Sequence, residues 1–350
     1  MRLKTSVLLL SSVLVLAGCG TTQPHLQGGN APTTQSKPKL PPQFHVVKRT
    51  NQLGGQTFDP QGVLSHDQVM LSPQITANNK SVFVVWGARD SKGDDYLYIS
   101  VEQNGKWTQV DKKIKIGHLV DWSKSYVNSN TYYNVSDYPY QNQTSSIWAI
   151  SWDDNGKETS VGNIYKGPLF GYYNVISNTG KSTFLIRKSS SSTRYEILNA
   201  NHQTATFNDT LNRIENVADP NQPMLLDSAN DTLYFGNGHL EALNLKSGKP
   251  LFDASGQDKF VDLGTLYGAA FSNAGNLVFD HSGVNGTPGK TIDILMTKPD
   301  LTPVGTFLGE FPYTFTDSYL HWSNDNQLAI LAISTYQDQP AIEETILKFS

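Results

Sequence analysis

The sequence predicts an all-β fold built from repeated modules of four short strands. After residue 43, one strand-and-turn pattern recurs at nearly constant spacing. A second turn precedes each copy and recurs with nearly the same spacing. The composition agrees, because 16 Tyr, 15 Phe and 6 Trp accompany only 17% charged residues. Aromatic and small polar residues with few charges favour strands joined by tight turns.

The clearest repeat is a pair of strand–turn–strand segments at residues 99–110 and 150–161, which lie 51 residues apart. Each segment places Asn-Gly at the same point, and this dipeptide is the strongest short hairpin signal. Successive copies are separated by 46 to 52 residues, because similar strands begin near Ile197, Leu243, Ile294 and Ile346. We expect each copy to form a hairpin.

A second set of turns supports the same period. Turns rich in Asn and Gly lie near residues 79, 129, 179, 230, 274 and 325. Most of them separate two apolar strands, so one module offers four strands, which we letter A to D in chain order. Four antiparallel strands repeated about every 40 to 50 residues are typical of a β-propeller blade. We therefore expect six four-stranded blades over residues 43–350, with a β-sandwich or two separate domains as the competing interpretation.

The sixth module lacks its fourth strand, and this predicts how the ring closes. Its A, B and C strands fall at residues 319–322, 328–333 and 343–349, and the sequence ends at Ser350. A sheet edge left open would expose unpaired backbone groups. Residues 44–48, an isolated apolar strand before the first module, are expected to pair with the C-terminal blade and close the ring.

The N-terminal segment is similar to the signal of bacterial lipoproteins. Arg2 and Lys4 precede an apolar run at residues 7–16, and the run Leu-Ala-Gly-Cys that ends at Cys19 resembles their lipobox. The resemblance implies that residues 1–18 are a signal peptide and that Cys19 carries a diacylglycerol, with a further acyl chain such as palmitate on its amine. An ordinary signal peptide or a membrane helix is the alternative, although the apolar run is short for a bilayer.

Residues 19–42 are expected to form a flexible tether. The stretch after Cys19 contains five prolines and no aromatic residue, so it cannot bury enough apolar surface to offset the entropy lost on ordering. Its root-mean-square reach is on the order of 25 to 30 Å. We expect it to hold the folded body at the extracytoplasmic face of the cell membrane, or of the outer membrane in a host with two membranes.

Charge and cysteine usage exclude several classes of partner. Loss of Arg2 and Lys4 with the signal changes the formal net charge from −4 to −6, and a mildly acidic surface argues against nucleic acid. Since Cys19 is the only cysteine, the chain has no intramolecular disulfide and no thiolate metal site. We expect a monomer whose partners are the membrane and either an envelope protein or a glycan.

One blade resembles a known repeat. Residues 233–249, Leu-Tyr-Phe-Gly-Asn-Gly-His-Leu-Glu-Ala-Leu-Asn-Leu-Lys-Ser-Gly-Lys, are similar to the blade motif of quinoprotein-like (PQQ-type) propellers, a WD40/PQQ-like repeat. The resemblance covers about one blade and implies the fold. Most non-enzymatic members of that family bind no quinone, and the calcium site of its dehydrogenases has no recognisable counterpart, so we expect no cofactor and no metal. The histidines also lack metal-ligand spacing such as H-E-x-x-H.

Acidic pairs and short motifs give no catalytic signature. The pairs at residues 94–95, 153–154 and 343–344 are expected to be solvated turn residues. Neighbours on a strand point to opposite faces, so such a pair does not by itself make an acid/base couple. No G-x-S-x-G elbow, P-loop or G-x-G-x-x-G motif before a helix occurs.

Candidate binding residues gather in the D-to-A and B-to-C connections, which emerge together on one face of a propeller. We call this the loop face. Irregular loops on a rigid frame are where function concentrates, and flat aromatic rings with polar neighbours suit a sugar ring or a peptide. The candidates on this face are Arg89, Asp121, Trp122, Tyr138, Tyr140, Tyr165 and Phe170.

Two function classes remain open. The first, which we favour, is a non-catalytic binding or scaffold module displayed outside the membrane for a protein or cell-envelope ligand. The second is an extracellular carbohydrate-active hydrolase or lyase that uses loop-face carboxylates such as Asp94 or Asp121. An enzyme requires two carboxylates or an arginine cluster that converge at the channel mouth, so the lining of the channel discriminates between the two classes.

Overall fold

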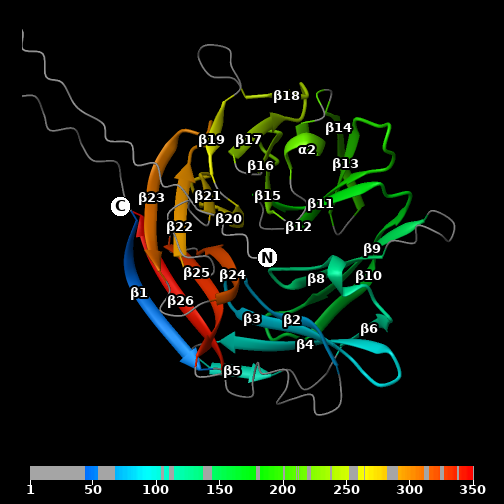
Figure 1. The fold of residues 1–350 in the computed structure, drawn as a ribbon, viewed down its shortest axis with the longest axis vertical. Helices are drawn as coiled ribbons and strands as arrows, with labels where there is room; N and C mark the ends of the chain where they lie inside the picture. The colour runs from blue at the N-terminus through cyan, green and yellow to red at the C-terminus, as the bar shows by residue number, and fades with distance from the viewer. Residues whose placement is uncertain are drawn as a thin grey trace, which may run out of the picture. The chain divides into compact units, whose positions relative to one another are not determined.

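The computed structural model describes residues 44–53, 68–103, 106–109, 114–136, 144–178, 182–199, 202–209, 211, 213–218, 222–236, 239–251, 259–263, 265–281, 291–310, 315–323, 327–336 and 339–349. They belong to one compact unit, Pro41–Ser350 (Figure 1). Cys19, the tether at residues 19–42, Tyr138 and Tyr140 lie outside the described residues.

Six antiparallel blades follow one another around a central channel (Figure 1). Blade one contains β2 (Gln68–Ala77), β3 (Val82–Arg89) and β4 (Asp94–Gln103), with β5 (Lys106–Gln109) and β6 (Ile114–His118) paired with opposite ends of β4. Blade two contains β7 (Ser125–Asn128), β8 (Thr131–Ser136), β9 (Ser145–Trp152) and β10 (Glu158–Gly167). Blade three contains β11 (Gly171–Ser177), β12 (Ser182–Arg187), β13 (Arg194–Asn199) and β14 (His202–Asn208).

The other three blades complete the ring. Blade four contains β15 (Met224–Asp227), β16 (Thr232–Gly236) and β17 (His239–Asn244), with β18 (Lys249–Pro250) and β19 (Phe260–Asp262) along β17. Blade five contains β20 (Leu266–Phe271), β21 (Leu277–His281), β22 (Thr291–Thr297) and β23 (Pro303–Glu310). Blade six contains β24 (Phe315–Trp322), β25 (Gln327–Tyr336), β26 (Gln339–Phe349) and β1 (Phe44–Leu53).

The predicted closure of the ring is confirmed. β1 pairs antiparallel with β26, from Phe44 opposite Phe349 to Leu53 opposite Ala341. The N-terminal strand thus supplies the D strand of the sixth blade, and it is longer than the predicted residues 44–48. Each residue that marked a repeat in the sequence lies in the third strand of its blade, so the period was assigned correctly and the sandwich interpretation is wrong.

Blades three and four share a contact that the repeat pattern did not predict. Their innermost strands, β11 and β15, pair in parallel over Val175 to Ser177 and Met224 to Leu226, which joins the two blades into one nine-stranded sheet. Ladder hydrogen bonds therefore add to side-chain packing at this interface.

In the described part of the chain, the core forms six apolar clusters, one between each pair of neighbouring blades. Successive residues of a strand point to opposite faces of its sheet, so one strand serves two clusters. In β3, Phe83 and Val85 pack towards blade two, whereas Val84, Trp86 and Ala88 pack towards blade six. Since both faces of each blade are covered, its inner strands read as continuous apolar runs.

Among the residues that the structure describes, helical structure is confined to two short segments on the loop face. The 3-10 helix η2 (Trp122–Lys124) lies between blades one and two, and α2 (Arg213–Val217) lies between blades three and four. Among the described residues, no helix has the length and apolar character needed to cross a membrane. The same residues hold no group of three or more His, Cys, Asp or Glu side chains placed to bind a metal ion.

Candidate functional site

The channel between the A strands has an uncharged lining over the residues that the structure describes. Its cavity has a volume of about 180 Å³, and all six blades line it with residues that lie in their innermost strands or directly beside them. The polar lining residues include Gln74, Tyr126, Asn174, Tyr267 and Tyr319. No Asp, Glu, Lys or Arg belongs to the described lining. The described lining of the channel therefore offers no carboxylate for proton transfer.

Ionisable groups meet instead in a groove on the loop face between blades one and two. The groove has a volume of about 320 Å³. One wall is the end of β6 with the connection that follows it, residues 116–121, and the other is the surface of β8 and β9. We call it the loop-face groove.

The sheet wall of the groove is built from three cross-strand pairs, which are Tyr132–Ile150, Asn134–Trp148 and Ser136–Ser146. The Tyr132–Ile150 pair lies deepest in the groove, and the serine pair lies at the end of the wall next to the connection between β8 and β9. Asn134 is fixed because its Nδ2 donates to the Asp121 carbonyl oxygen at 2.8 Å and to Ser125 Oγ at 3.2 Å. Trp148 is half-buried and lines the cavity, so an aromatic surface faces any occupant.

The opposite wall carries a histidine–aspartate pair. His118 lines the groove, and its Nδ1 lies 3.3 Å from Asp94 Oδ1. Lys115 Nζ donates to the other Asp94 oxygen at 2.5 Å. This hydrogen bond from Lys115, with a smaller contribution from His118, holds the pKa of Asp94 below its ordinary value. An ionised Asp94 can only accept, so it places the proton of neutral His118 on Nδ1 and leaves Nε2 as the acceptor.

Asp121 supplies a further carboxylate to the groove. Its side chain is 53% exposed, and Oδ1 accepts from the backbone N–H and the hydroxyl of Ser123, which caps η2. Lys124 Nζ lies 3.9 Å from Oδ2. Between His118 and Asp121, Leu119 has a φ of +50° and is 63% exposed. A leucine with a left-handed backbone conformation is unusual. Such a conformation persists where many contacts with the surrounding structure fix the segment.

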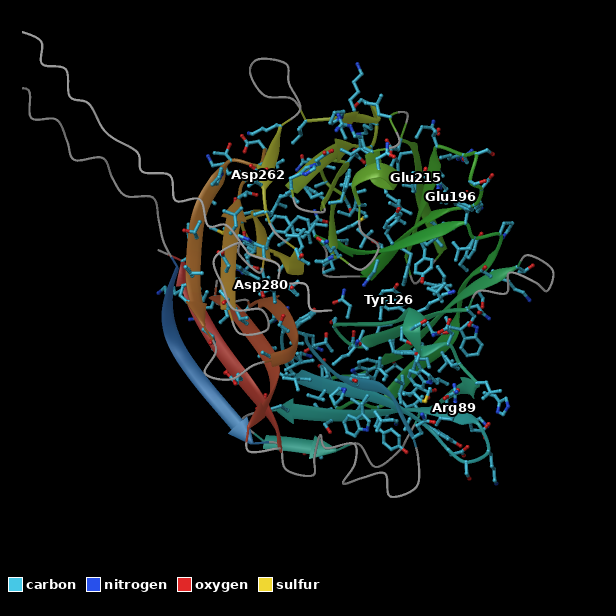
Figure 2. The ribbon with its side chains drawn as sticks, in the orientation of Figure 1. Arg89, Tyr126, Glu196, Glu215, Asp262 and Asp280 are labelled. Atoms are coloured by element: carbon cyan, nitrogen blue, oxygen red, sulfur yellow. The ribbon has the colours of Figure 1, made fainter. Side chains whose placement is uncertain are left out.

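A buried carboxylate fixes this segment. Asp95 is fully inaccessible, and it accepts four hydrogen bonds: from Arg89 Nε at 2.9 Å, Arg89 Nη2 at 3.1 Å, the Val120 backbone N–H at 2.6 Å and Trp122 Nε1 at 2.9 Å. Arg89 Nη2 also donates to the Val120 carbonyl at 2.9 Å (Arg89 is labelled in Figure 2). The groove wall is therefore anchored to β3 and β4 on both sides of Asp121.

Packing of Trp122 completes the anchor. A Cβ atom added to Gly87 would lie 2.2 Å from two carbons of the Trp122 ring. The indole thus occupies the space that the absent side chain leaves, and it stands 6.1 Å from the Tyr132 ring. The expectation that Trp122 presents its face to a ligand is wrong, since it is 6% exposed and belongs to the core.

The remaining candidates divide between two places. Arg89, Asp121 and Trp122 come together around the loop-face groove, but only Asp121 lines it. Tyr165 and Phe170 belong to blade two and its exit towards blade three, where Lys188 lies 5.9 Å from the Tyr165 ring. Tyr165 also donates from its hydroxyl to the Pro168 carbonyl. The structure does not describe Tyr138 and Tyr140, so their candidacy stays a prediction.

Phe170 lies at an ion pair on blade three. It is 54% exposed, and the guanidinium carbon of Arg187 stands 4.7 Å from its ring centroid. Arg187 makes two hydrogen bonds with Glu215 of α2, at 2.5 and 2.8 Å (Glu215 is labelled in Figure 2). These bonds hold the pKa of Glu215 below its ordinary value. The arginine is satisfied by its own neighbours, so Phe170 is a stacking partner within the fold.

Two of the three acidic pairs differ from their expected solvation. Asp95 and Glu343 are buried, because strand alternation turns one member of each of these two pairs inward. Asp153 and Asp154 lie in the turn between β9 and β10 and are partly exposed, as expected.

Sequence reasoning also missed His118 and Trp148, whose roles depend on contacts between two blades. Another missed group is Asp280 in β21 of blade five, where burial raises the pKa to about 7 (Figure 2). Asp280 lines none of the cavities described above.

No protein-family model and no curated protein matches the chain in sequence. Similar solved structures include a subtype N11 neuraminidase-like protein of A/flat-faced bat/Peru/033/2010 (H18N11) (13% identity, 88% of this chain and 94% of that chain, TM-score 0.42). Another is the soluble aldose sugar dehydrogenase of Escherichia coli in its apo form (11%, 85% and 99%, TM-score 0.42). A mutant sialidase of Trypanosoma rangeli is 10% identical over 80% of this chain, with a TM-score of 0.39. This chain spans about half of that sialidase, 54% of its length.

These comparisons contradict the expectation of a non-catalytic binding or scaffold module, because the similar structures include sialidases and sugar dehydrogenases. That expectation is corrected, and the second class, a carbohydrate-active enzyme, is retained. Likenesses at this level concern the fold alone, so the chemistry of this chain has to come from its own groove.

Proposed function

We propose that this protein is an extracytoplasmic, carbohydrate-active hydrolase that cleaves a glycosidic bond in the loop-face groove. One observation carries the proposal: the groove brings an aromatic surface, a histidine oriented by a carboxylate, and a separate carboxylate into one cavity of about 320 Å³. This volume lies within the range of about 300 to 1,000 Å³ typical of small-molecule sites.

The groove walls match the chemistry of a sugar. Trp148 offers a flat apolar surface to the C–H face of a pyranose, while Asn134, Ser136 and Ser146 offer hydrogen bonds to its hydroxyls. Asn134 is already fixed by its bonds to Asp121 and Ser125. A sugar held on this wall faces His118 and Asp121 on the other.

Hydrolysis requires one group that takes a proton from water and another that gives one to the departing glycosidic oxygen. Because Asp94 engages Nδ1 of His118, the nitrogen through which His118 takes up or gives a proton in the reaction is Nε2. Asp121 supplies the second group from the same groove. Water adds across the broken bond, so the two products are a new reducing end and a new free hydroxyl.

We further propose that Cys19 anchors the enzyme through lipid and that residues 19–42 are its tether. β1 begins at Phe44 beside Phe349, at the end of blade six opposite the loop face. The described chain thus begins at the end of the ring opposite the loop-face groove, which suits action on a glycan outside the membrane. Labelling with a radioactive fatty acid tests the anchor, and loss of label in Cys19→Ala is the expected result.

The catalytic proposal is tested by reducing-end release from peptidoglycan glycan strands, chitin oligosaccharides and an acidic polysaccharide. General acid–base groups contribute about 10²- to 10⁴-fold, so His118→Asn and Asp121→Asn should each lower kcat by at least about 100-fold. Trp148→Ala should raise KM more than it lowers kcat. Asp300→Asn is the matched control, because Asp300 is an exposed turn carboxylate outside the groove.

Three outcomes would contradict the proposal. If the wild-type protein releases no reducing ends from any of the three glycans, the protein is not the proposed hydrolase. If His118→Asn and Asp121→Asn both keep full activity, the loop-face groove is not the catalytic site. Release of an unsaturated sugar would identify β-elimination in place of hydrolysis.

A further inference from the structure

We propose a second binding site, for a neutral saccharide, at the opposite end of the channel from the loop face. The A-to-B turns of the blades surround this end, and we call it the turn face. The site is separate from the proposed catalytic groove, because the described linings of the two cavities have no residue in common.

The cavity at the turn face is large enough for a disaccharide. Its volume is about 480 Å³, and five of the six blades contribute to its lining. It continues into the channel, because Asn128, Ile176 and Tyr319 line both cavities. Sites for organic ligands typically span about 300 to 1,000 Å³.

Amide and hydroxyl side chains dominate the lining. Blades one, two, three and five each place Asn or Ser at the end of the A strand, and these residues are Asn78, Asn79, Asn128, Ser129, Ser177, Asn178, Ser272 and Asn273. Aromatic side chains stand among them, namely Phe271, Tyr319 and Trp322. Amides that pair with hydroxyls, beside aromatic rings that pack on C–H faces, are the complement of a saccharide.

The rim is held rigid by hydrogen bonds between blades. Nδ2 of Asn78 donates to Asp154 of blade two at 2.9 Å, Nδ2 of Asn178 donates to Asp227 of blade four at 2.9 Å, and Nδ2 of Asn273 donates to the Ser323 carbonyl of blade six at 3.1 Å. These bonds use the amide nitrogens. The side-chain carbonyl oxygens of Asn178 and Asn273 are then the atoms suited to accept hydrogen bonds from ligand hydroxyls.

The absence of charge selects a neutral ligand. No Asp, Glu, Lys or Arg belongs to the described lining. Burial lowers the pKa of His321, the one titratable imidazole of the lining, which keeps it neutral at pH 7. A charged ligand would lose hydration here without gaining a counter-charge, whereas the hydroxyls of a neutral sugar exchange water for amide partners.

Calorimetric titration of the full-length chain with cellobiose, maltose and the N-acetylglucosamine disaccharide tests the site, in a detergent without a sugar headgroup. Asn79 is exposed in the turn of blade one and lines the cavity, so Asn79→Trp should block the mouth and weaken binding at least tenfold. Asn79→Asp is a smaller second variant, which brings a charge to the cavity and should also weaken binding. Ser228→Trp is the matched control, because Ser228 is exposed in the equivalent turn of blade four, which does not line the cavity.

Saturable binding that is lost in Asn79→Trp and preserved within twofold in Ser228→Trp supports the site. Binding by none of the three disaccharides overturns it, and so does binding that both Asn79 variants leave unchanged. Loss of binding only in Trp148→Ala would also overturn it, since the saccharide would then occupy the loop-face groove. Reducing-end release should be unchanged in Asn79→Trp, which separates this test from that of the hydrolase.

Discussion

Replacing Asp95 by asparagine should destabilise the protein far more than the same change at its neighbour Asp94. Each oxygen of the inaccessible Asp95 carboxylate accepts two bonds: Oδ1 from Arg89 Nε and Trp122, and Oδ2 from Arg89 Nη2 and the Val120 N–H. Asparagine has only one side-chain oxygen that accepts. In either orientation of its amide, two of the four hydrogen bonds are lost and the amide NH2 group faces two of the donors. Removing one charge of a buried pair costs about 3 to 5 kcal/mol, and since the amide keeps half of the bonds, we expect about 3 kcal/mol.

Urea unfolding monitored by tryptophan fluorescence measures this loss. Asp94→Asn is the internal control, because the partners of Asp94, Lys115 and His118, are exposed and exposed pairs contribute little. Its unfolding midpoint should stay close to that of the wild type. The reasoning is refuted if Asp95→Asn lowers the free energy of unfolding by less than about 1 kcal/mol, or by no more than Asp94→Asn does.

Two other substitutions probe the core. Gly87→Ala would place a Cβ atom 2.2 Å from the Trp122 ring; overpacking of this kind costs about 1 to 3 kcal/mol, which a lower urea midpoint and shifted tryptophan emission would report. Asp280→Asn tests pH dependence: burial raises the folded-state pKa from 3.8 to about 7, so the folded protein keeps a proton that the unfolded chain releases as the pH rises. Wild-type stability should therefore fall by about 4 kcal/mol between about pH 4 and pH 7 on account of this group, and urea unfolding of the variant should lack that fall.

The ring could be predicted from the sequence because its signals are local and periodic. Asn-Gly and Asn/Ser turns recur in step, and the missing D strand of the last module demands a partner, which β1 provides. The parallel pairing of β11 with β15 carries no such signal. It depends on how closely two neighbouring blades approach, and turn chemistry says nothing about that distance.

The candidate site could be predicted only in part, and the reason lies in pairing across strands. Arg89 and Asp95 stand directly opposite each other in the β3–β4 hairpin, so their ion pair was deducible once the hairpin register was known. The meeting of His118 with Trp148 was not deducible, since it requires two blades to pack with their D-to-A connection between them. An exposed aspartate and a buried one also look alike as neighbours in a sequence.

The position of the groove follows from how blade one ends. Its outer edge is divided between β5 and β6, which pair with opposite ends of β4. From β6 the chain must cross inward to β7, and that crossing lies over the interface between blades one and two. Asp95 binds the crossing on both sides of Asp121 through Val120 and Trp122. The wall that carries His118 and Asp121 is therefore positioned by the fold itself, so the cost of ordering this wall has been met on folding and does not fall on ligand binding.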